Sequence, residues 1–384
     1  MQKTTLGDNK QCVKSLLQSG IECPFLIPEY QRPYAWTYEQ VETLFNDIWD
    51  HTILSGDSEK NKYFLGTIVA YINENDEQEI IDGQQRITSL FLLLRAIYEK
   101  LQKSDGKRSQ HFSKEIRETI WRTDKYTGEV NFGEILIRSE VISKDSNTIL
   151  QKILETGTAD PAATDRYSKN YIFFQELFEK ASAKDPLMIY DFIYTLLNKA
   201  VLLPIMAVDQ ENALMIFSTL NDRGMPLSDA DIYKAKLYNN QGTKEKKEDF
   251  ISDWIKLDED AKGAGESIQQ LFYYYMFYLR ATENDSSSTT PGARKYYLES
   301  TKIKSRLYSP NLMKHLWAIL NFWSVVSKQA IFENEPWSTN QDILRALDIL
   351  TSYPNEFWKY PVIIYYLSHK DKSSFQKRFL LFLQ

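Results

Sequence analysis

The sequence is poor in the residues that build disulfide frameworks and metal centres. Its 384 residues include two cysteines, Cys12 and Cys23, and four histidines. Two cysteines near one end do not form a disulfide framework, so we expect a reducing, cytoplasmic compartment. The histidines are scattered along the chain and lack the spacing of a zinc site.

The common nucleotide-binding fingerprints are also absent. The chain contains neither Gly-x-x-x-x-Gly-Lys-Ser/Thr nor Gly-x-Gly-x-x-Gly. Its densest apolar run, Leu90 to Leu94, is far too short to cross a membrane, and the N-terminus does not resemble a signal peptide. We therefore expect no membrane partner.

Excess positive charge is missing as well. The net charge of −6 excludes a globally basic DNA-coating protein, so any DNA contact requires a local basic patch. The segment Lys100 to Lys125 is one candidate, with eight Lys and Arg residues against four Asp and Glu residues. A solvated and partly flexible insertion near residues 103–130 is the alternative, and the sequence alone favours it.

What the sequence does contain is typical of a large globular protein. Hydrophobic residues make up 43% and aromatic residues 14% of a chain that is long enough for two or three domains. We predict an α+β domain over residues 1–240 and an all-α domain, dense in aromatic side chains, over residues 241–384. The N-terminal domain would contain the basic insertion.

One stretch organises the first domain, the ten residues from Ile80 to Ser89. A β-branched strand ends at Asp82, Gly83 makes a tight turn, and apolar residues then recur at helical spacing to about Lys103. Free N–H groups at a helix start favour anions, and Arg86 adds a forked cationic contact. Asp82 is a candidate ligand for a metal ion or a water.

The same residues have a structural alternative. Asp82 and Gln85 have the spacing of a capping box, which would only terminate the helix. Capping, however, requires one such group, and the neighbouring Gln84 and Arg86 would then have no role.

A second polar segment, Tyr30-Gln31-Arg32, lies between Pro28 and Pro33 and leads into a helix that Thr37 and Gln40 should cap. Pro33 restricts Arg32 to extended backbone and therefore aims its side chain. A binding role and an exposed turn with buried aromatic residues both fit this pattern.

Further along, Tyr63 to Ile72 and Gln78 to Ile81 read as a β-hairpin, and Ala200 to Val208 as a strand with Pro204 at an edge or bulge. A helix ending near Leu220 precedes a loop with Asn221 and Arg223. Taken alone, this is an ordinary helix–turn–helix corner.

Three separated stretches are more specific together than any one of them. They are Ile27 to Trp36, Tyr63 to Gly66 running on to Asp82-Gly83-Gln84-Gln85-Arg86, and Phe217 to Lys234. In this order they resemble the N-terminal domain family of GmrSD-type modification-dependent restriction systems, to which the phosphorothioate-sensing SspE proteins also belong. The resemblance covers roughly residues 8 to 240.

This resemblance implies a ParB/sulfiredoxin-like α+β core and a phage-defence role, with triphosphate hydrolysis coupled to recognition of modified DNA. GTP is the favoured nucleotide, with Mg²⁺ held by Asp82. The catalytic residues would be Asp82, Gln84, Gln85 and Arg86. The nucleotide would be bound by Gly83, Arg86, Thr88, Arg32, Asn221 and Arg223. DNA sensing would fall to Tyr30, Gln31 and Arg32.

The family also has a C-terminal HNH-type nuclease domain. No His-Asn-His grouping occurs here, and the chain ends within the apolar run Phe379 to Gln384. We therefore expect that domain to be missing and no nuclease activity in these residues. A non-hydrolysing nucleotide or DNA-backbone switch and a protein-interaction scaffold are alternative functions. The target modification and homo-oligomer formation stay open.

Overall fold

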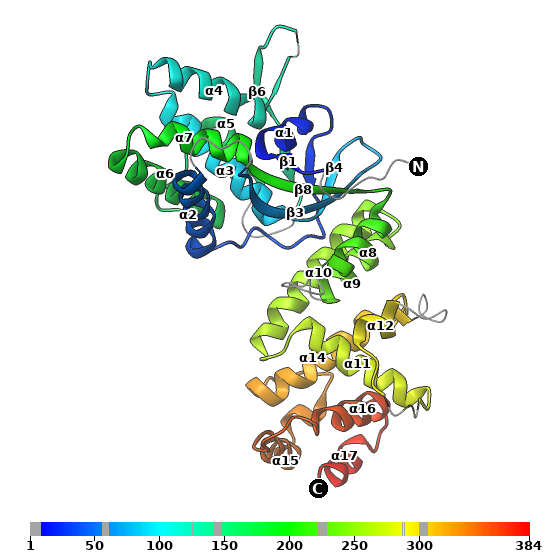
Figure 1. Ribbon diagram of the computed structural model, residues 1–384. Helices are drawn as coiled ribbons and strands as arrows, with labels where there is room; N and C mark the ends of the chain where they lie inside the picture. The colour runs from blue at the N-terminus through cyan, green and yellow to red at the C-terminus, as the bar shows by residue number, and fades with distance from the viewer. Residues whose placement is uncertain are drawn as a thin grey trace. The chain divides into compact units, whose positions relative to one another are not determined.

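A computed structural model describes residues 9–55, 61–124, 126–141, 147–220, 229–285, 287, 289–298 and 306–384. The chain divides into two compact units, residues 1–226 and 227–384, and each is described by itself (Figure 1). The boundary at residue 240 stays a prediction.

The first unit is built on a mixed six-stranded sheet. In spatial order its strands are β1 (Gln11–Cys12), β8 (Ala200–Ala207), β3 (Tyr63–Ile72), β4 (Gln78–Asp82), β2 (Phe25–Ile27) and β7 (Ile137–Ser139). β3 and β4 form the predicted antiparallel hairpin, while β2 runs parallel to β4 and β3 runs parallel to β8. The prediction of an α+β fold is thus confirmed for this unit.

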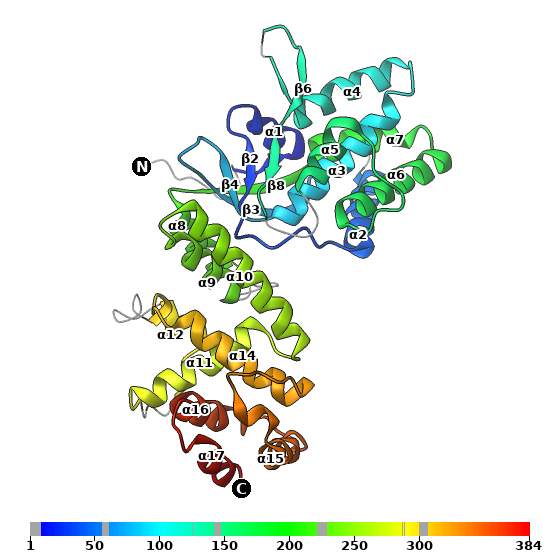
Figure 2. The ribbon, with the colours of Figure 1, turned by 180° about the vertical axis from the view of Figure 1, so that it is seen from behind.

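These pairings bring several loops to one edge of the sheet. The carboxyl ends of the parallel neighbours β2 and β4 meet there, together with the start of the antiparallel strand β3 (Figure 2). The segment that follows β2, residues 28–36, is here called the Arg32 loop. It therefore lies beside the turn after β4, as expected where parallel strands end.

One face of this sheet is covered by helices that share its hydrophobic core. They are α1 (Val13–Gln18), α2 (Tyr38–Ser55), α3 (Gln84–Leu101), α4 (Lys107–Ile120), α5 (Asn147–Thr156), α6 (Arg166–Lys184) and α7 (Met188–Tyr194), which a π-helical turn (Thr195–Lys199) extends. The predicted capping box of α2 is confirmed in part: Gln40 Oε1 accepts from the Thr37 N–H at 2.7 Å, while the Thr37 hydroxyl donates to the same oxygen at 2.6 Å.

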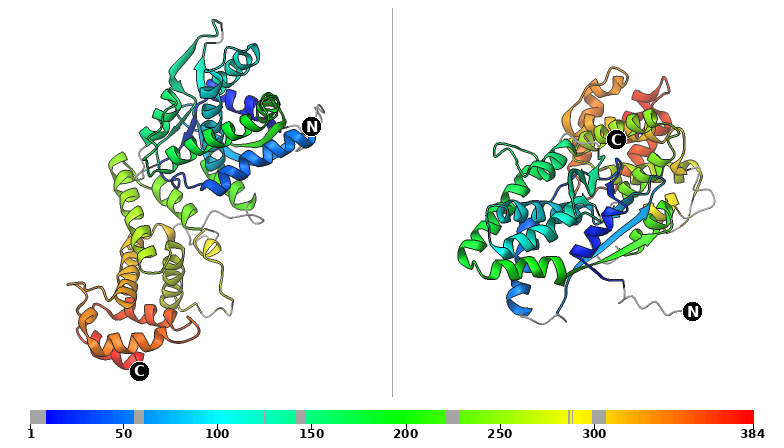
Figure 3. Two further views of the ribbon diagram at one scale, coloured as in Figure 1. Left: turned by 90° about the vertical axis from the view of Figure 1, so that its left-hand side faces the viewer. Right: turned by 90° about the horizontal axis from the view of Figure 1, so that it is seen from above.

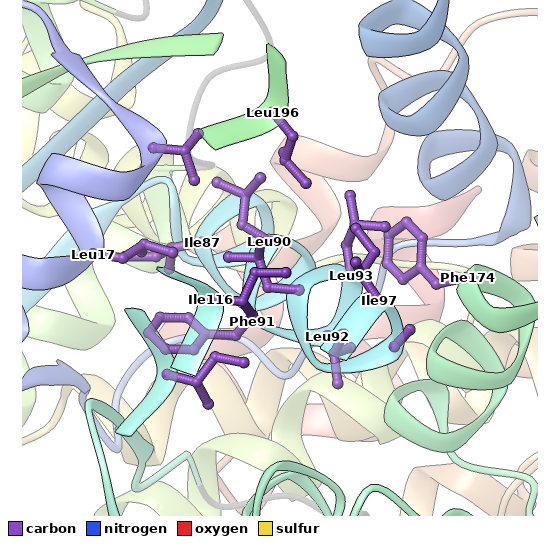
Figure 4. Close-up of a cluster of buried hydrophobic side chains, with 14 of the residues drawn as sticks. Leu17, Ile87, Leu90, Phe91, Leu92, Leu93, Ile97, Ile116, Phe174 and Leu196 are labelled. Atoms are coloured by element: carbon purple, nitrogen blue, oxygen red, sulfur yellow. The ribbon is translucent and has the colours of Figure 1, made fainter. Parts of the chain in front are cut away.

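Helix α3 is the centre of the hydrophobic core. Ile87, Leu90, Phe91, Leu93 and Ile97 are fully buried on it and pack among side chains from the other elements of the unit (Figure 4). Such burial makes α3 a fixed support for the turn at its start.

The opposite face of the sheet packs against α8 (Gln210–Leu220), which contacts β3, β4 and β8. Pro204 pairs with Ile68 of β3, whereas β1 pairs only with Val201 and Leu202 of β8. Pro204 therefore needs no hydrogen bond on its open side, and the predicted edge position is confirmed.

The basic segment is part of the folded unit. Lys107 to Ile120 forms α4, whose Phe112, Ile116 and Ile120 are buried in the core. The hairpin of β5 (Trp121–Thr123) and β6 (Val130–Ile135) follows. Reading this segment only as a solvated insertion was wrong, because one apolar face of α4 is buried.

The second unit is helical throughout its described residues (Figure 3). Its helices are α9 (Asp229–Asn239), α10 (Lys244–Gly263), α11 (Ile268–Thr282), α12 (Ala293–Leu298), α14 (Leu312–Lys328), a 3₁₀ turn (Pro336–Thr339), α15 (Gln341–Thr351), α16 (Lys359–His369) and α17 (Phe375–Leu383). Aromatic side chains such as Tyr274, Tyr297 and Trp337 fill its interior, as the composition predicts. Where the chain is described, no helix has the length and apolarity needed to span a bilayer.

Candidate functional site

The predicted strand–turn–helix junction is confirmed, and its glycine is sterically required. Gly83 adopts φ +90°, and a Cβ there would meet Ile68 Cδ1 at 2.3 Å and Thr67 O at 3.1 Å. α3 begins at the next residue, with Gly83 in the cap position and no side-chain cap. The alternative of an Asp82–Gln85 capping box is therefore excluded, and the first N–H groups of α3 receive no cap from a side chain.

Asp82 lies half-buried at the end of β4. Burial raises the pKa of its carboxyl above the ordinary value, while the Gly83 N–H and the charges of Arg86 and Arg32 act in the opposite direction. No basic side chain of the described chain lies within the 4.0 Å of an ion pair with Asp82. Its carboxylate is thus held near two cations without being neutralised by direct contact.

Arg86 lies in the first turn of α3 and is held by the backbone of β3. Its Nη1 donates to Thr67 O at 3.1 Å. Gly66 adopts φ +120° beside a register shift in β3, and a Cβ there would lie 3.0 Å from the guanidinium carbon. Gly66 therefore gives the guanidinium room to lie against the strand. Burial lowers the Arg86 pKa, and the Asp82 charge opposes that shift.

The two glutamines of the motif hold the Arg32 loop. Gln85 Oε1 accepts from the N–H groups of Ala35 at 2.7 Å and Trp36 at 3.3 Å, and its Nε2 donates to Pro33 O. Gln84 is buried and donates to Gln31 Oε1 at 3.1 Å. Both amides thus position the backbone and side chains of a neighbouring loop.

Within the Arg32 loop, the three residues of the predicted DNA sensor differ in exposure. Tyr30 and Gln31 are buried, at 4% and 6% exposure, whereas the Arg32 side chain is exposed. Gln31 Nε2 donates to Ile81 O at 3.0 Å, and the Tyr30 hydroxyl donates to Glu79 Oε1 at 2.6 Å. Only Arg32 is placed to reach a ligand in solvent.

Sequence reasoning missed the residues of α8, β4 and α6 that hold the Arg32 loop by hydrogen bonds. Gln210, the first residue of α8, donates to the Tyr30 hydroxyl at 2.7 Å, and Glu79 accepts from that hydroxyl. Asn170 of α6 donates to Trp36 O at 2.8 Å. No local pattern marks them, because each is an isolated polar residue that gains its partner only through the tertiary fold.

The structure therefore brings together Asp82, Gly83, Arg86 and Arg32, with Gln84 and Gln85 as supports. Thr88 is 1% exposed, so it lies within the core rather than at the surface of the site. Asn221 and Arg223 lie outside the described residues. No group of three His, Cys, Asp or Glu side chains suited to a metal occurs in the described part of the chain.

Comparison with protein families gives a match over residues 13–238 to the model described as "GmrSD restriction endonuclease, N-terminal domain". This region contains all the residues of the site and more than half of the chain. Comparison with curated proteins gives no match.

Proposed function

This chain belongs to the GmrSD restriction endonuclease N-terminal domain family, and we propose that its first unit binds and hydrolyses a nucleoside triphosphate to regulate DNA restriction. Membership makes the chain a restriction-system component, with DNA as the target and a nuclease domain as partner. The nucleotide, its hydrolysis, the sensing of modified DNA and a ParB/sulfiredoxin-like fold for the sheet are parts of the proposal.

The observation that carries the proposal is that two charged side chains are half-buried at the start of α3. Asp82 and Arg86 are both half-buried, and burial opposes the charge of each. They lie at a helix start that no side chain caps, beside the exposed Arg32. Structural charges are ordinarily paired with an opposite charge, so half-buried charges without an ion pair among the described residues, at an anion-favouring helix end, support a ligand site.

Phosphate binding follows from three donors that converge there. The N–H groups of the first turn of α3 favour negative charge, and the Arg86 guanidinium adds a fixed fork beside them. Arg32 approaches from the neighbouring loop, which Gln85 and Gln31 hold in place. In this arrangement Gln84 and Gln85 position the Arg32 loop rather than a water, because each amide is oriented by a hydrogen bond to that loop.

Asp82 is the group placed to orient the attacking water. Its raised pKa keeps it a better proton acceptor than an exposed aspartate at neutral pH. A single carboxylate with substrate oxygens and waters suits Mg²⁺, so Asp82 fits the predicted metal ligand. Bound Mg²⁺ would neutralise charge on the phosphates.

Calorimetric titration with ATP, GTP, CTP and UTP, with and without Mg²⁺, tests binding, and phosphate release tests hydrolysis. We expect micromolar binding of at least one triphosphate that Arg86→Ala weakens by about a hundredfold, near 2.7 kcal/mol. The matched control Arg122→Ala removes an exposed arginine of β5 and should leave affinity unchanged. Absence of binding for all four nucleotides would refute the proposal.

One observation favours a second function, a nucleotide switch without hydrolysis. The side-chain amides of Gln84 and Gln85 each use an N–H to hold the Arg32 loop, so their orientation is set by that loop rather than by a water. Binding without phosphate release would select the switch. Failure to bind any nucleotide would instead favour a protein-interaction scaffold.

A further inference from the structure

A pocket adjoins the proposed phosphate site. It has a volume of about 280 Å³ and lies between the first half of α2 and the start of β3, with Arg86 in its wall. This α2 pocket is lined by residues that include Trp36, Thr43, Asp47, Tyr63, Phe64 and Arg86. Trp36 and Arg86 join it to the first turn of α3, because Gln85 of that turn accepts from the Trp36 N–H.

The lining combines aromatic surface with hydrogen-bond acceptors. Trp36, Tyr63 and Phe64 supply rings, and Leu44 and Leu65 supply apolar surface. Asp47 Oδ2 accepts from the Tyr63 hydroxyl at 2.7 Å, which leaves Oδ1 to accept from a ligand. Flat, partly apolar surface with few polar groups is the chemistry that holds a nucleobase, and the volume suits a base rather than a whole nucleotide.

The charges of the pocket fix the direction of a bound nucleotide. Glu39 and Asp47 lie on one face of α2, two turns apart with Thr43 between them, while Arg86 is the cation in the wall. A triphosphate is repelled by the two carboxylates and attracted by Arg86 and the first turn of α3. Its uncharged end must therefore point along α2 toward Asp47.

We infer that the α2 pocket is the base subsite of the nucleotide site and that it selects bases with an exocyclic amino group. This inference rests on the proposed function, and it adds where the base lies and which edge is read. The Asp47 carboxylate accepts from an amino N–H as a carboxylate does from the cytosine amino group. Uracil presents a carbonyl oxygen at the same position, which the carboxylate repels.

Two matched variants of the whole chain test the location. Thr43→Trp fills the pocket from an exposed position of α2, and Glu42→Trp puts the same ring on a neighbouring exposed position outside the lining. The probes are the β,γ-methylene analogue of CTP and inorganic tripolyphosphate, both titrated by calorimetry. We expect Thr43→Trp to weaken the CTP analogue by at least about tenfold, near 1.4 kcal/mol, and tripolyphosphate by less than about twofold.

Glu42→Trp should change neither affinity. A Thr43→Trp variant that binds the CTP analogue like the unmodified chain would overturn the base subsite and leave the proposed function standing. If neither probe binds the unmodified chain, the base subsite fails as stated, and the titration with all four triphosphates still decides the proposed function.

Asp47→Asn tests the selectivity. The unmodified chain should prefer the CTP analogue to the UTP analogue by about tenfold, and Asp47→Asn should reduce this ratio below about threefold, because an amide can donate to the uracil oxygen. Asn keeps an oxygen for the Tyr63 hydroxyl, so the melting temperature serves as the folding control. An unchanged ratio would exclude Asp47 as the group that reads the base.

Discussion

Two carboxylates, one in each unit, have opposite surroundings. Glu335 of the helical unit is 4% exposed and accepts from Trp337 Nε1 at 2.8 Å, the Tyr366 hydroxyl at 2.6 Å and Lys370 Nζ at 2.9 Å. Asp82 of the first unit is half-buried, and among the described residues it has the Gly83 N–H beside it but no comparable set of side-chain donors. Glu335 joins three side chains of the helical unit by hydrogen bonds. Asp82 lies at the end of β4 and forms no such network among the described residues.

The difference separates structural from functional polar groups without reference to the family. A buried carboxylate with three donors recovers its lost hydration within the protein, so its removal affects folding. A partly desolvated carboxylate with no ion-pair partner costs folding free energy, and this cost supports the ligand role proposed for Asp82. The predictions that follow test this difference by substituting residues of the proposed site, of the helical unit and of the basic segment.

The largest effect is expected for Asp82→Asn. Loss of the charge should lower phosphate release by on the order of a hundredfold or more. Because the pKa of Asp82 is raised in the folded state, its ionisation costs stability as the pH rises above the ordinary value of 3.8. The variant should therefore melt at or above the temperature of the unmodified chain at pH 7, and this difference should vanish below about pH 3.

The counterpart is Glu335→Gln. It leaves the Lys370 ammonium without its charged partner and should destabilise the helical unit by about 3 kcal/mol, with turnover per folded molecule unchanged. Thermal melting and phosphate release on both variants provide the test. A destabilised Asp82→Asn protein with normal turnover would return Asp82 to a structural role.

Gly66→Ala should have the next largest effect. The added Cβ meets the Arg86 guanidinium at 3.0 Å and should displace it, so triphosphate affinity should fall about tenfold. Gly128→Ala is the matched control, because Gly128 also has a positive φ but its added Cβ meets nothing within 4 Å. Equal affinities in the two variants would show that Gly66 does not set the position of Arg86.

Lys234 is a buried charge of the helical unit that, unlike Glu335, is destabilised by its burial. Its side chain is 7% exposed, and burial lowers its pKa to about 8 despite the nearby charges of Asp231 and Asp258. A depressed pKa means that stability is lost as the pH falls through about 8. Lys234→Met should therefore raise stability by about 1–3 kcal/mol at pH 7 and by less near pH 10.5. Melting curves across this range measure the stability cost of the buried Lys234 charge, and equal curves for the variant and the unmodified chain would show that there is none.

The smallest effect is expected for the basic segment. Neutralising Lys103, Lys107 and Arg108 together should weaken DNA binding and reduce its salt slope by about 0.9 for each DNA phosphate that these side chains neutralise. Triphosphate hydrolysis should be unchanged, because α3 separates these residues from Gly83 by roughly 25 Å at about 1.5 Å per residue. A salt slope equal to that of the unmodified chain would remove this segment from the DNA surface.

Local pattern was sufficient for much of the first unit. Aromatic and β-branched residues on either side of a turn predicted β3 and β4, and Gly83 followed by apolar residues at helical spacing predicted the start of α3. The same reasoning misjudged α4, whose many charges concealed a buried face of Phe112, Ile116 and Ile120. A charged composition does not reveal which face a helix buries.

The sequence by itself determined the strand–glycine–helix junction, because backbone conformation at Gly83 and helical periodicity are local properties. Tertiary structure alone decided which polar residues are available to a ligand. Gln84 and Gln85 adjoin Arg86 in sequence, yet both bond the Arg32 loop, while Arg32 and Arg86 come from separate strand ends to the same edge. The hydrogen-bond partners of Gln84 and Gln85 lie about 50 residues away in the sequence, so only the folded chain shows that these amides bond the protein.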